Sequence, residues 1–191
     1  RAFDLYLELG DREGAITVAV HPHFFYGRVS GSAELLSRAL DLVSDDAPET
    51  GQLLELYGLA LGSELEDAAG AKIALEKSLE LARSTGNLDL EARVLGSLSW
   101  SRYHELDYRG SIEAGRAAIE LARNRDRDLV NAWPHVGMAF SLLALGEPNA
   151  ASHHVEIVTT FLERMGNREP AIPGWIMYQV ARLRGDFTTM S

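Results

Sequence analysis

Similar turns recur at an interval of about forty residues along this chain. The spacings are 40, 40 and 39 residues between the turn residues Asp67, Asp107, Glu147 and Asp186. Each turn lies between two segments whose apolar residues repeat at helical spacing. A repeat of this length indicates a series of helix pairs, in which each pair packs on the next.

The helix after each turn carries a face of small and aliphatic residues. Ala74, Ser78, Leu81 and Ala82 fall on one side of a helix. Equivalent positions one interval later and one interval earlier are Ala114, Ala118, Leu121 and Ala122, and Leu35, Ala39, Leu42 and Val43. Small residues let a neighbouring helix approach closely, and this face is stabilising only when a neighbour covers it.

The breaks between helix pairs contain residues that suit helix ends. Gly86 can adopt the left-handed conformation that ends a helix, and Asn87 can tolerate it. Asp89 and Asp128 suit the first turn of the following helices. Pro134 is expected near the start of its helix, where its missing N–H has no partner to lose.

The predicted fold class is all-α: an α-solenoid, a right-handed superhelix of antiparallel helix pairs with repeats of about forty residues. Ala15 to Gly27 is rich in β-forming residues, but its first part follows a turn and is predicted as helix. The predicted helices are 1–9, 12–20, 32–44, 50–63, 67–85, 89–104, 108–124, 128–145, 148–166 and 171–184. An irregular segment is expected at 21–31.

We expect one helical repeat domain over residues 1–191, cut from a larger multidomain protein. The expected parts are a degenerate N-terminal unit at 1–45, repeats at about 50–87, 88–127 and 128–167, and a truncated last repeat at 170–191. The chain does not begin with methionine and ends on "RGDFTTMS", and both ends favour a fragment.

Composition excludes several classes of function. Eighteen basic residues against 28 acidic ones give a net charge of −10, which argues against a nucleic-acid-binding surface. Cysteine is absent, so thiol catalysis and thiolate zinc sites are excluded. No signal peptide is visible, and the uncharged run from Leu129 to Gly146 contains Asn131, Pro134 and His135, which favours a buried helix over a membrane span. We therefore expect a cytoplasmic location and no membrane contact.

The repeated pattern resembles the tetratricopeptide repeat. The stretch "SLSWSRYHELDYRGS" carries Leu98, Ser99, Tyr103, Asp107 and Ser111, with Ala118 following. The stretch "GMAFSLLALGEPNAA" carries Met138, Ala139, Glu147 and Ala151. The units of about forty residues exceed the usual 34, which predicts longer helices or turns.

A narrower resemblance concerns "FDLYLELGDREGA", "LELARSTGNLDLEARVL" and "RAAIELARNRDRD". These stretches look like the tetratricopeptide region of bacterial signal-transduction ATPases, the LuxR/MalT-type transcriptional regulators and adenylate-cyclase-type regulators. The resemblance implies a sensor or scaffold role beside ATPase or output domains of the parent protein. The chain has no GxxxxGK[ST] phosphate loop, so ATP hydrolysis is not expected. Its net negative charge argues against direct nucleic-acid contact.

In tetratricopeptide stacks the first helix of each pair lines the concave face. The resemblance therefore implies a ligand or partner surface formed by Arg93, Trp100, Tyr103, His104, Trp133, Phe140, Trp175, Gln179 and Arg182, with Val136 and Leu143 on the same face. All three tryptophans fall on this surface, and such rings supply contact area with a polar handle. The alternative is that longer helices rotate some of these rings into the core.

Neither a metal site, a cofactor nor a catalytic residue is expected. His153 and His154 are adjacent on a helix and diverge by about 100°, while His21 and His23 have no carboxylate nearby. His154 stands where Ala74 and Ala114 stand in other repeats. The carboxylate pairs Glu64/Glu66 and Asp45/Asp46 fall at expected turns, where solvated or helix-capping roles fit better than acid–base catalysis.

Two hypotheses of function follow. The first is a non-enzymatic module whose concave face binds a protein, a peptide or a small effector, with Arg93 and Arg182 holding an anionic group. The second is a structural or oligomerisation segment whose aromatic face is covered within its parent protein or by a second copy of the chain.

Overall fold

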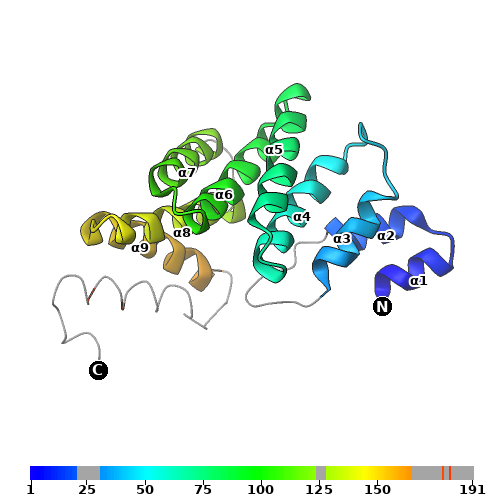
Figure 1. Cartoon of the computed structure of the whole chain (residues 1–191), viewed down its shortest axis with the longest axis horizontal. Coiled ribbons are helices and arrows are strands. Elements are labelled where there is room, and N and C mark those ends of the chain that lie inside the picture. Colours follow the sequence, from blue (N-terminus) through cyan, green and yellow to red (C-terminus); the bar gives the residue numbers. More distant parts are fainter. Residues whose placement is uncertain (21–30, 124–127, 165–177, 179–180, 182–191) are drawn as a thin grey trace. The chain divides into compact units, whose positions relative to one another are not determined.

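The described part of the chain is entirely helical. The computed structural model describes residues 1–20, 31–123, 128–164, 178 and 181, and these residues form nine α-helices (Figure 1). The helices are α1 (Ala2–Glu8), α2 (Arg12–Val20), α3 (Ser32–Leu40), α4 (Thr50–Glu64), α5 (Ala68–Ser84), α6 (Leu88–His104), α7 (Tyr108–Ala122), α8 (Asp128–Ala144) and α9 (Pro148–Arg164). The predicted all-α fold is confirmed, including a helix over the first part of the β-rich segment, up to Val20.

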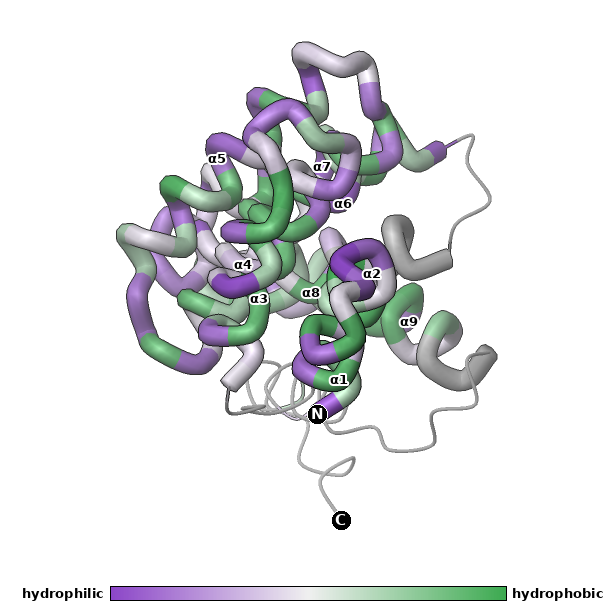
Figure 2. The backbone as a smooth tube through the Cα atoms, turned by 90° about the vertical axis from the view of Figure 1, so that its right-hand side faces the viewer, coloured by the Kyte–Doolittle hydropathy of each residue, from purple (hydrophilic) through white to green (hydrophobic). Residues whose placement is uncertain are grey.

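The chain divides into two compact units, Arg1–Leu90 and Glu91–Ser191. In the first unit α1 packs on α2, α3 on α4, and α4 on α5. In the second unit α7 packs on α8 and α8 on α9. Hydrophobic and hydrophilic residues alternate along the helices at helical spacing (Figure 2). The assignment of residues 1–191 to one repeat domain stays a prediction.

One predicted helix is too long at its C-terminus. The expected helix 32–44 ends at Leu40, because the following loop makes its own bonds. Leu42 N–H bonds to the carbonyl three residues earlier, and Thr50 Oγ1 donates to the Ser44 carbonyl at 2.7 Å. Such local side-chain bonds compete with continued helix. The expected helix 171–184 and most of the irregular segment 21–31 lie outside the described residues.

Three turns between helices share one construction. An aspartate caps the new helix by accepting a bond from the N–H of a glycine three residues later. The bonds are Gly14 N–H to Asp11 Oδ1 at 2.8 Å, Gly70 N–H to Asp67 Oδ1 at 2.9 Å and Gly110 N–H to Asp107 Oδ1 at 3.0 Å. A Cβ added at any of these glycines would collide with the capping carboxylate. The turn is therefore specified by aspartate and glycine together.

In four turns, an acidic residue stands just before the next helix. The residue that precedes this acidic residue has a left-handed backbone conformation. The φ angles are 73° at Gly10, 54° at Glu66, 64° at Leu106 and 77° at Gly146. Asp107 N–H then bonds to the Arg102 carbonyl at 2.9 Å, a pattern that ends a helix and satisfies its last carbonyls.

Replacing Leu106 by glycine is expected to stabilise the chain by about 0.5–1 kcal/mol, since glycine adopts positive φ without the clash of a Cβ. Leu106 is 71% exposed, so little packing is lost. The measurement is the urea midpoint at constant m-value. Gly146→Leu, which places leucine in the same conformation at the α8–α9 turn, should shift the midpoint in the opposite direction. Equal shifts for the two variants would contradict this explanation.

Glu64 caps a helix other than its own. Its Oε1 accepts a hydrogen bond from Ser32 N–H at 3.1 Å, and its Oε2 accepts one from Ala33 N–H at 3.2 Å. A carboxylate at a helix N-terminus is favourable because the first N–H groups have no partner within the helix. The helix-capping interpretation of this carboxylate is confirmed.

The predicted faces of small residues are buried. Ala74, Ser78 and Ala82 of α5 are at most 6% exposed, and Ser78 Oγ donates to the Gly51 carbonyl at 2.6 Å. On α7 the equivalent residues Ala114, Ala118 and Ala122 are also buried. The repeat in the sequence therefore marks repeated helix packing.

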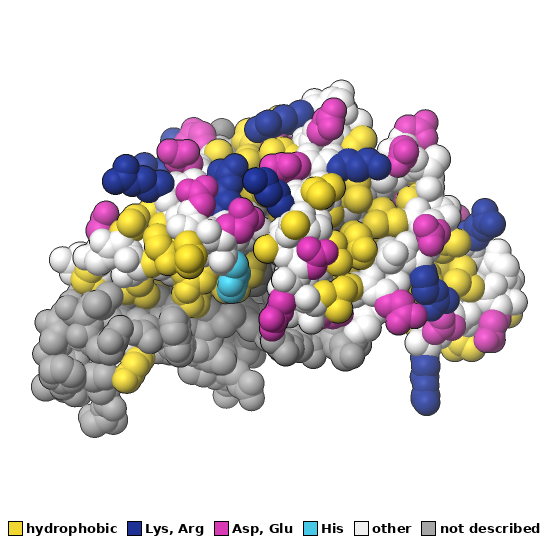
Figure 3. Space-filling model, viewed as in Figure 1, with side chains coloured by type: hydrophobic (Ala, Val, Ile, Leu, Met, Phe, Trp, Pro, Cys, Tyr) yellow, Lys and Arg dark blue, Asp and Glu magenta, His cyan; other side chains and the backbone are white. Residues whose placement is uncertain are grey.

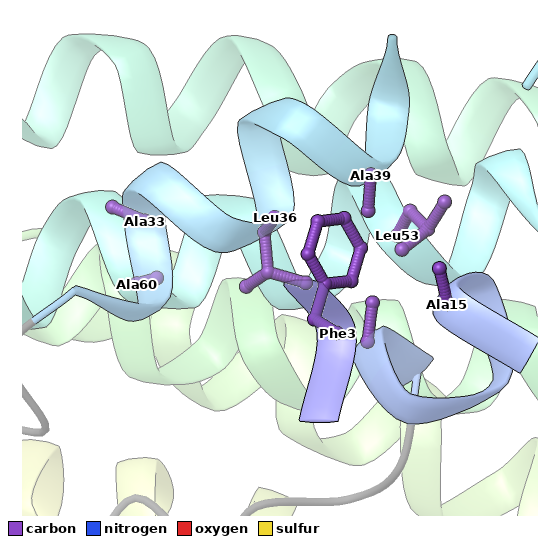
Figure 4. Packing of buried hydrophobic residues seen from close by; sticks show 8 residues of the cluster. Phe3, Ala15, Ala33, Leu36, Ala39, Leu53 and Ala60 are labelled. Atoms are coloured by element: carbon purple, nitrogen blue, oxygen red, sulfur yellow. The ribbon is translucent and has the colours of Figure 1, made fainter. Parts of the chain in front are cut away.

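Phe3 is the largest side chain in the core of the first unit. It is 1% exposed, and its ring lies among Leu36, Ala39 and Leu53 (Figure 4). The remaining small residues of this cluster include Ala15. Phe3 is therefore the one buried residue of the short helix α1, and the partly buried Leu7 packs against the same cluster.

In the second unit three buried serines join α6, α7 and α8. Ser111 Oγ donates to the Ser99 carbonyl at 2.7 Å, and Ser141 Oγ donates to Ser111 Oγ at 2.8 Å. Gly137 of α8 lies against Ser99 of α6. A Cβ added at Gly137 would be 2.5 Å from Ser99 Oγ and 3.0 Å from Trp100 N. The three helices therefore approach closely at small residues.

Pro134 lies inside α8, so the prediction that it occupies the first turn is wrong. The helix starts at Asp128, six residues earlier. A proline there removes one main-chain hydrogen bond. Pro134 is fully buried, and an added Cβ at Gly96 of α6 would be 3.1 Å from its ring. The ring of Pro134 in α8 therefore packs closely against Gly96 in α6.

Among the described residues, no helix is both long enough and apolar enough to cross a membrane.

Candidate functional site

The candidate site is a group of aromatic side chains in the second unit. Trp100, Tyr103 and His104 lie on the last turns of α6, where spacings of three and four residues place them on one side of the helix. Trp100 and Tyr103 are half-buried and His104 is exposed. The predicted Phe140 of α8 joins them, and so does Tyr108 of α7, which was not predicted. We call these five residues the aromatic cluster.

Tyr103 lies at the centre of the aromatic cluster. Its ring centroid is 5.7 Å from Trp100, 5.1 Å from Phe140 and 6.1 Å from Tyr108. Trp100 meets His104 edge-on at 4.5 Å and Phe140 edge-on at 5.5 Å. These separations are those of favourable aromatic pairs. Three helices therefore contribute to one continuous group of rings.

The inner side of the aromatic cluster is part of the core. Trp100 and Phe140 pack against Val136 and Val158, with Phe161 nearby. Val136 is 2% exposed. The two interpretations offered by the sequence therefore each describe a part of the group: Trp100 and Phe140 contact the core, whereas His104 faces solvent. Figure 3 shows apolar side chains gathered on the visible surface of the second unit.

Tyr103 and His104 of the aromatic cluster favour their neutral forms. Burial raises the pKa of the Tyr103 hydroxyl, with a smaller contribution from Tyr108. Burial lowers the pKa of the His104 imidazole. Near pH 7 these two side chains therefore offer a hydroxyl and a neutral imidazole for hydrogen bonding, which suits contact with apolar or aromatic side chains.

Two arginines of α6, Arg93 and Arg102, lie close in the sequence to residues of the aromatic cluster. Arg93 is half-buried and precedes Trp100 by seven residues, about 10 Å along the helix axis. Arg102 donates through Nη1 to the Gly110 carbonyl at 3.0 Å, which fixes α6 to the start of α7. Arg102 therefore holds the helices that carry Tyr103 and Tyr108.

The structure brings together only some of the predicted site residues. Trp100, Tyr103, His104 and Phe140 share the aromatic cluster. The predicted inward-facing residues Val136 and Leu143 are buried, at 2% and 9% exposure, because they lie on the side of α8 that faces the core. Trp133 lies on α8 outside the residues whose side chains are described, and Trp175, Gln179 and Arg182 lie outside the described residues.

A pair of histidines joins α8 to α9. His135 Nδ1 and His154 Nδ1 are 2.6 Å apart. His154 occupies the repeat position of Ala114, as the sequence showed, but its pairing with His135 was missed. The sequence signal for this pairing is the same forty-residue interval, applied to the first helix of each pair. It places His135 at the repeat position of Leu95. Among the described residues no group of three or more histidines and carboxylates is arranged to hold a metal ion.

Tyr108 was not among the residues predicted for this surface. This residue follows the capping Asp107, so it lies at the start of the second helix of its pair. The short turn brings it back toward the end of α6, within reach of Tyr103. Its place could have been found by considering both sides of each turn instead of first helices alone.

Comparison with known proteins identifies the fold. A solved structure of nearly identical TPR-like repeats, assigned to a kinesin light chain of Podosopora anserina, has a TM-score of 0.52 over 97% of this chain and 93% of that chain. The sequence identity is 10%. No protein-family model and no curated protein matches this chain. Together with the nine described helices, this likeness shows an α-solenoid of TPR-like helix pairs.

Proposed function

We propose that this chain is a non-enzymatic interaction module that presents the aromatic cluster to a protein or peptide partner. The observation that carries the proposal is the junction of three helices at Tyr103, where rings from α6, α7 and α8 meet and His104 remains exposed. Aromatic residues that combine apolar area with a polar atom often dominate the energy of interfaces.

The setting of the module is proposed from the sequence resemblance. It is the sensor or scaffold region of a bacterial LuxR/MalT-type or adenylate-cyclase-type regulator. Its partner is a peptide, a protein domain such as the parent ATPase or output domain, or a small effector. Arg93 supports contact with an anionic group on that ligand, and binding reaches the parent protein through a change in helix packing or self-association.

A random-peptide display library on the immobilised chain tests the module. Peptides selected on the wild-type chain should bind at least about tenfold more weakly to a chain with Tyr103→Ala and His104→Ala, since central aromatic contacts carry much of an interface energy. The matched control is Ile73→Ala on α5, a 69% exposed apolar residue of the other unit. It should leave binding unchanged.

Two results would overturn the proposal. One is unchanged peptide affinity in the Tyr103/His104 variant when circular dichroism shows intact helices. The other is self-association of the wild-type chain that blocks peptide binding and disappears in the same variant, which would favour an oligomerisation segment. Sedimentation of both chains distinguishes this second result.

A further inference from the structure

The contact between α8 and α9 contains two imidazoles that face each other through the same ring nitrogen. His135 is 7% exposed, and His154 is half-buried. Their Nδ1 atoms are 2.6 Å apart, and their ring centroids are 4.9 Å apart. This geometry allows one hydrogen between the two nitrogens, so one ring carries its proton on Nδ1 and the other on Nε2. Two protonated rings would direct two N–H donors at each other.

The surroundings of this pair oppose protonation. Burial is the main cause that lowers the pKa of both imidazoles to about 4, and each ring also feels a histidine neighbour. The other charges that act on the pair are those of His153 on α9 and Arg116 on α7, and both are basic. Of the described residues, the groups that shift these two pKa values are therefore basic, and no carboxylate is among them.

The same place in the preceding helix pair is apolar. Forty residues before His135 and His154 stand Leu95 and Ala114, which are 7% and 4% exposed. A titratable pair is therefore specific to α8 and α9 and is not needed for the repeat to pack.

We propose that the His135–His154 pair makes the α8–α9 contact acid-sensitive: the helices pack while the pair shares one hydrogen between neutral rings, and the contact opens when both rings are protonated. Opening would expose Val155 and Val158 of α9, which are buried at 0% and 2%. Because Val158 supports Trp100 and Phe140, the change would reach the aromatic cluster.

The direction of the pH effect follows from proton binding. An unfolded histidine has a pKa of about 6.5, above the value of about 4 in the folded chain. The unfolded state therefore binds more protons, so the contribution of the pair is complete above pH 6.5 and is lost as the pH falls toward 4. Because the two imidazoles interact, their two protonation steps belong to the pair and not to either ring alone.

The test compares the wild-type chain with a chain carrying both His135→Leu and His154→Ala, which installs the residues of the preceding helix pair. Between pH 7 and pH 5 the midpoint of thermal unfolding should fall by at least about 5 °C more in the wild type. The remaining histidines are common to both chains, and a chelator excludes trace metals. His153→Ala should keep most of the wild-type pH dependence.

Local measurements keep the test decisive if the double variant fails to fold. In NMR titrations of the wild type, two imidazoles should remain neutral to well below pH 6. Hydrogen exchange of α9 amides, corrected for intrinsic rates, should rise at least tenfold more between pH 7 and pH 5 than exchange of α5 amides. Imidazoles that all titrate near pH 6.5, or an equal pH response of α9 and α5, would overturn the proposal.

Discussion

Phe3→Ala is expected to lower the free energy of unfolding by about 3–5 kcal/mol, the usual loss for removing a buried phenylalanine. The ring is 1% exposed among residues of α2, α3 and α4. A helix of seven residues has little stability alone, so α1 depends on this ring. Arg38 also contacts the ring at 5.0 Å and pairs with Asp4 at 2.9 Å, but that ion pair is exposed and solvent screens it.

Urea denaturation followed by circular dichroism measures this effect. The matched control is Leu5→Ala on the same helix, at a position that is 58% exposed, and its expected change is within about 0.5 kcal/mol. Proteolysis within α1 and α2 should also become faster in the Phe3 variant. A loss below 1 kcal/mol would show that α1 contributes little to the first unit.

Gly137→Ala is expected to destabilise the second unit by a net amount of about 2 kcal/mol, in spite of the gain of about 1 kcal/mol that alanine normally brings to a helix. The new Cβ would lie 2.9 Å from the main-chain carbon of Ser99 and 3.0 Å from Trp100 N. Main-chain atoms cannot move aside as the end of a flexible side chain can. Helices α6 and α8 would have to separate, and the bond from Ser111 to the Ser99 carbonyl would weaken.

Gly62→Ala is the matched control for this substitution. A Cβ at Gly62 of α4 meets only the Cβ of Ala71, at an ordinary 3.6 Å. Alanine there should therefore stabilise the chain by about 0.5–1 kcal/mol. Urea midpoints should move in opposite directions for the two variants. A stabilising Gly137→Ala would mean that α6 and α8 pack less closely than these distances indicate.

The sequence predicted the packing of the repeat because that packing depends on spacing alone. Ala74 and Ala114 are forty residues apart and are both buried on the helix that follows a turn. The predicted left-handed Gly86 has a φ of 66°. Asn87, by contrast, is not left-handed: its N–H bonds to the Ala82 carbonyl at 2.8 Å at the end of α5, and its Oδ1 accepts a bond from Leu90 N–H at 3.1 Å at the start of α6.

Helix ends and side-chain directions were harder to predict because they depend on contacts between distant residues. The end of α3 at Leu40 depends on the bond from Thr50 to Ser44, which helical periodicity does not reveal. The positions of Val136 and Phe140 differ by one helical turn, yet the first is buried and the second is half-buried. Both pack against the cluster that contains Val158 of α9, a contact that helical periodicity does not reveal.

The turns have a consequence for how the chain can fold during synthesis. The bonds at the α6–α7 turn join residues no more than five positions apart, from Arg102 to Asp107 and from Asp107 to Gly110. Contacts so local close quickly and do not wait for distant parts of the chain. Each turn can therefore take shape as it leaves the ribosome, before the helix pair that follows it has been made.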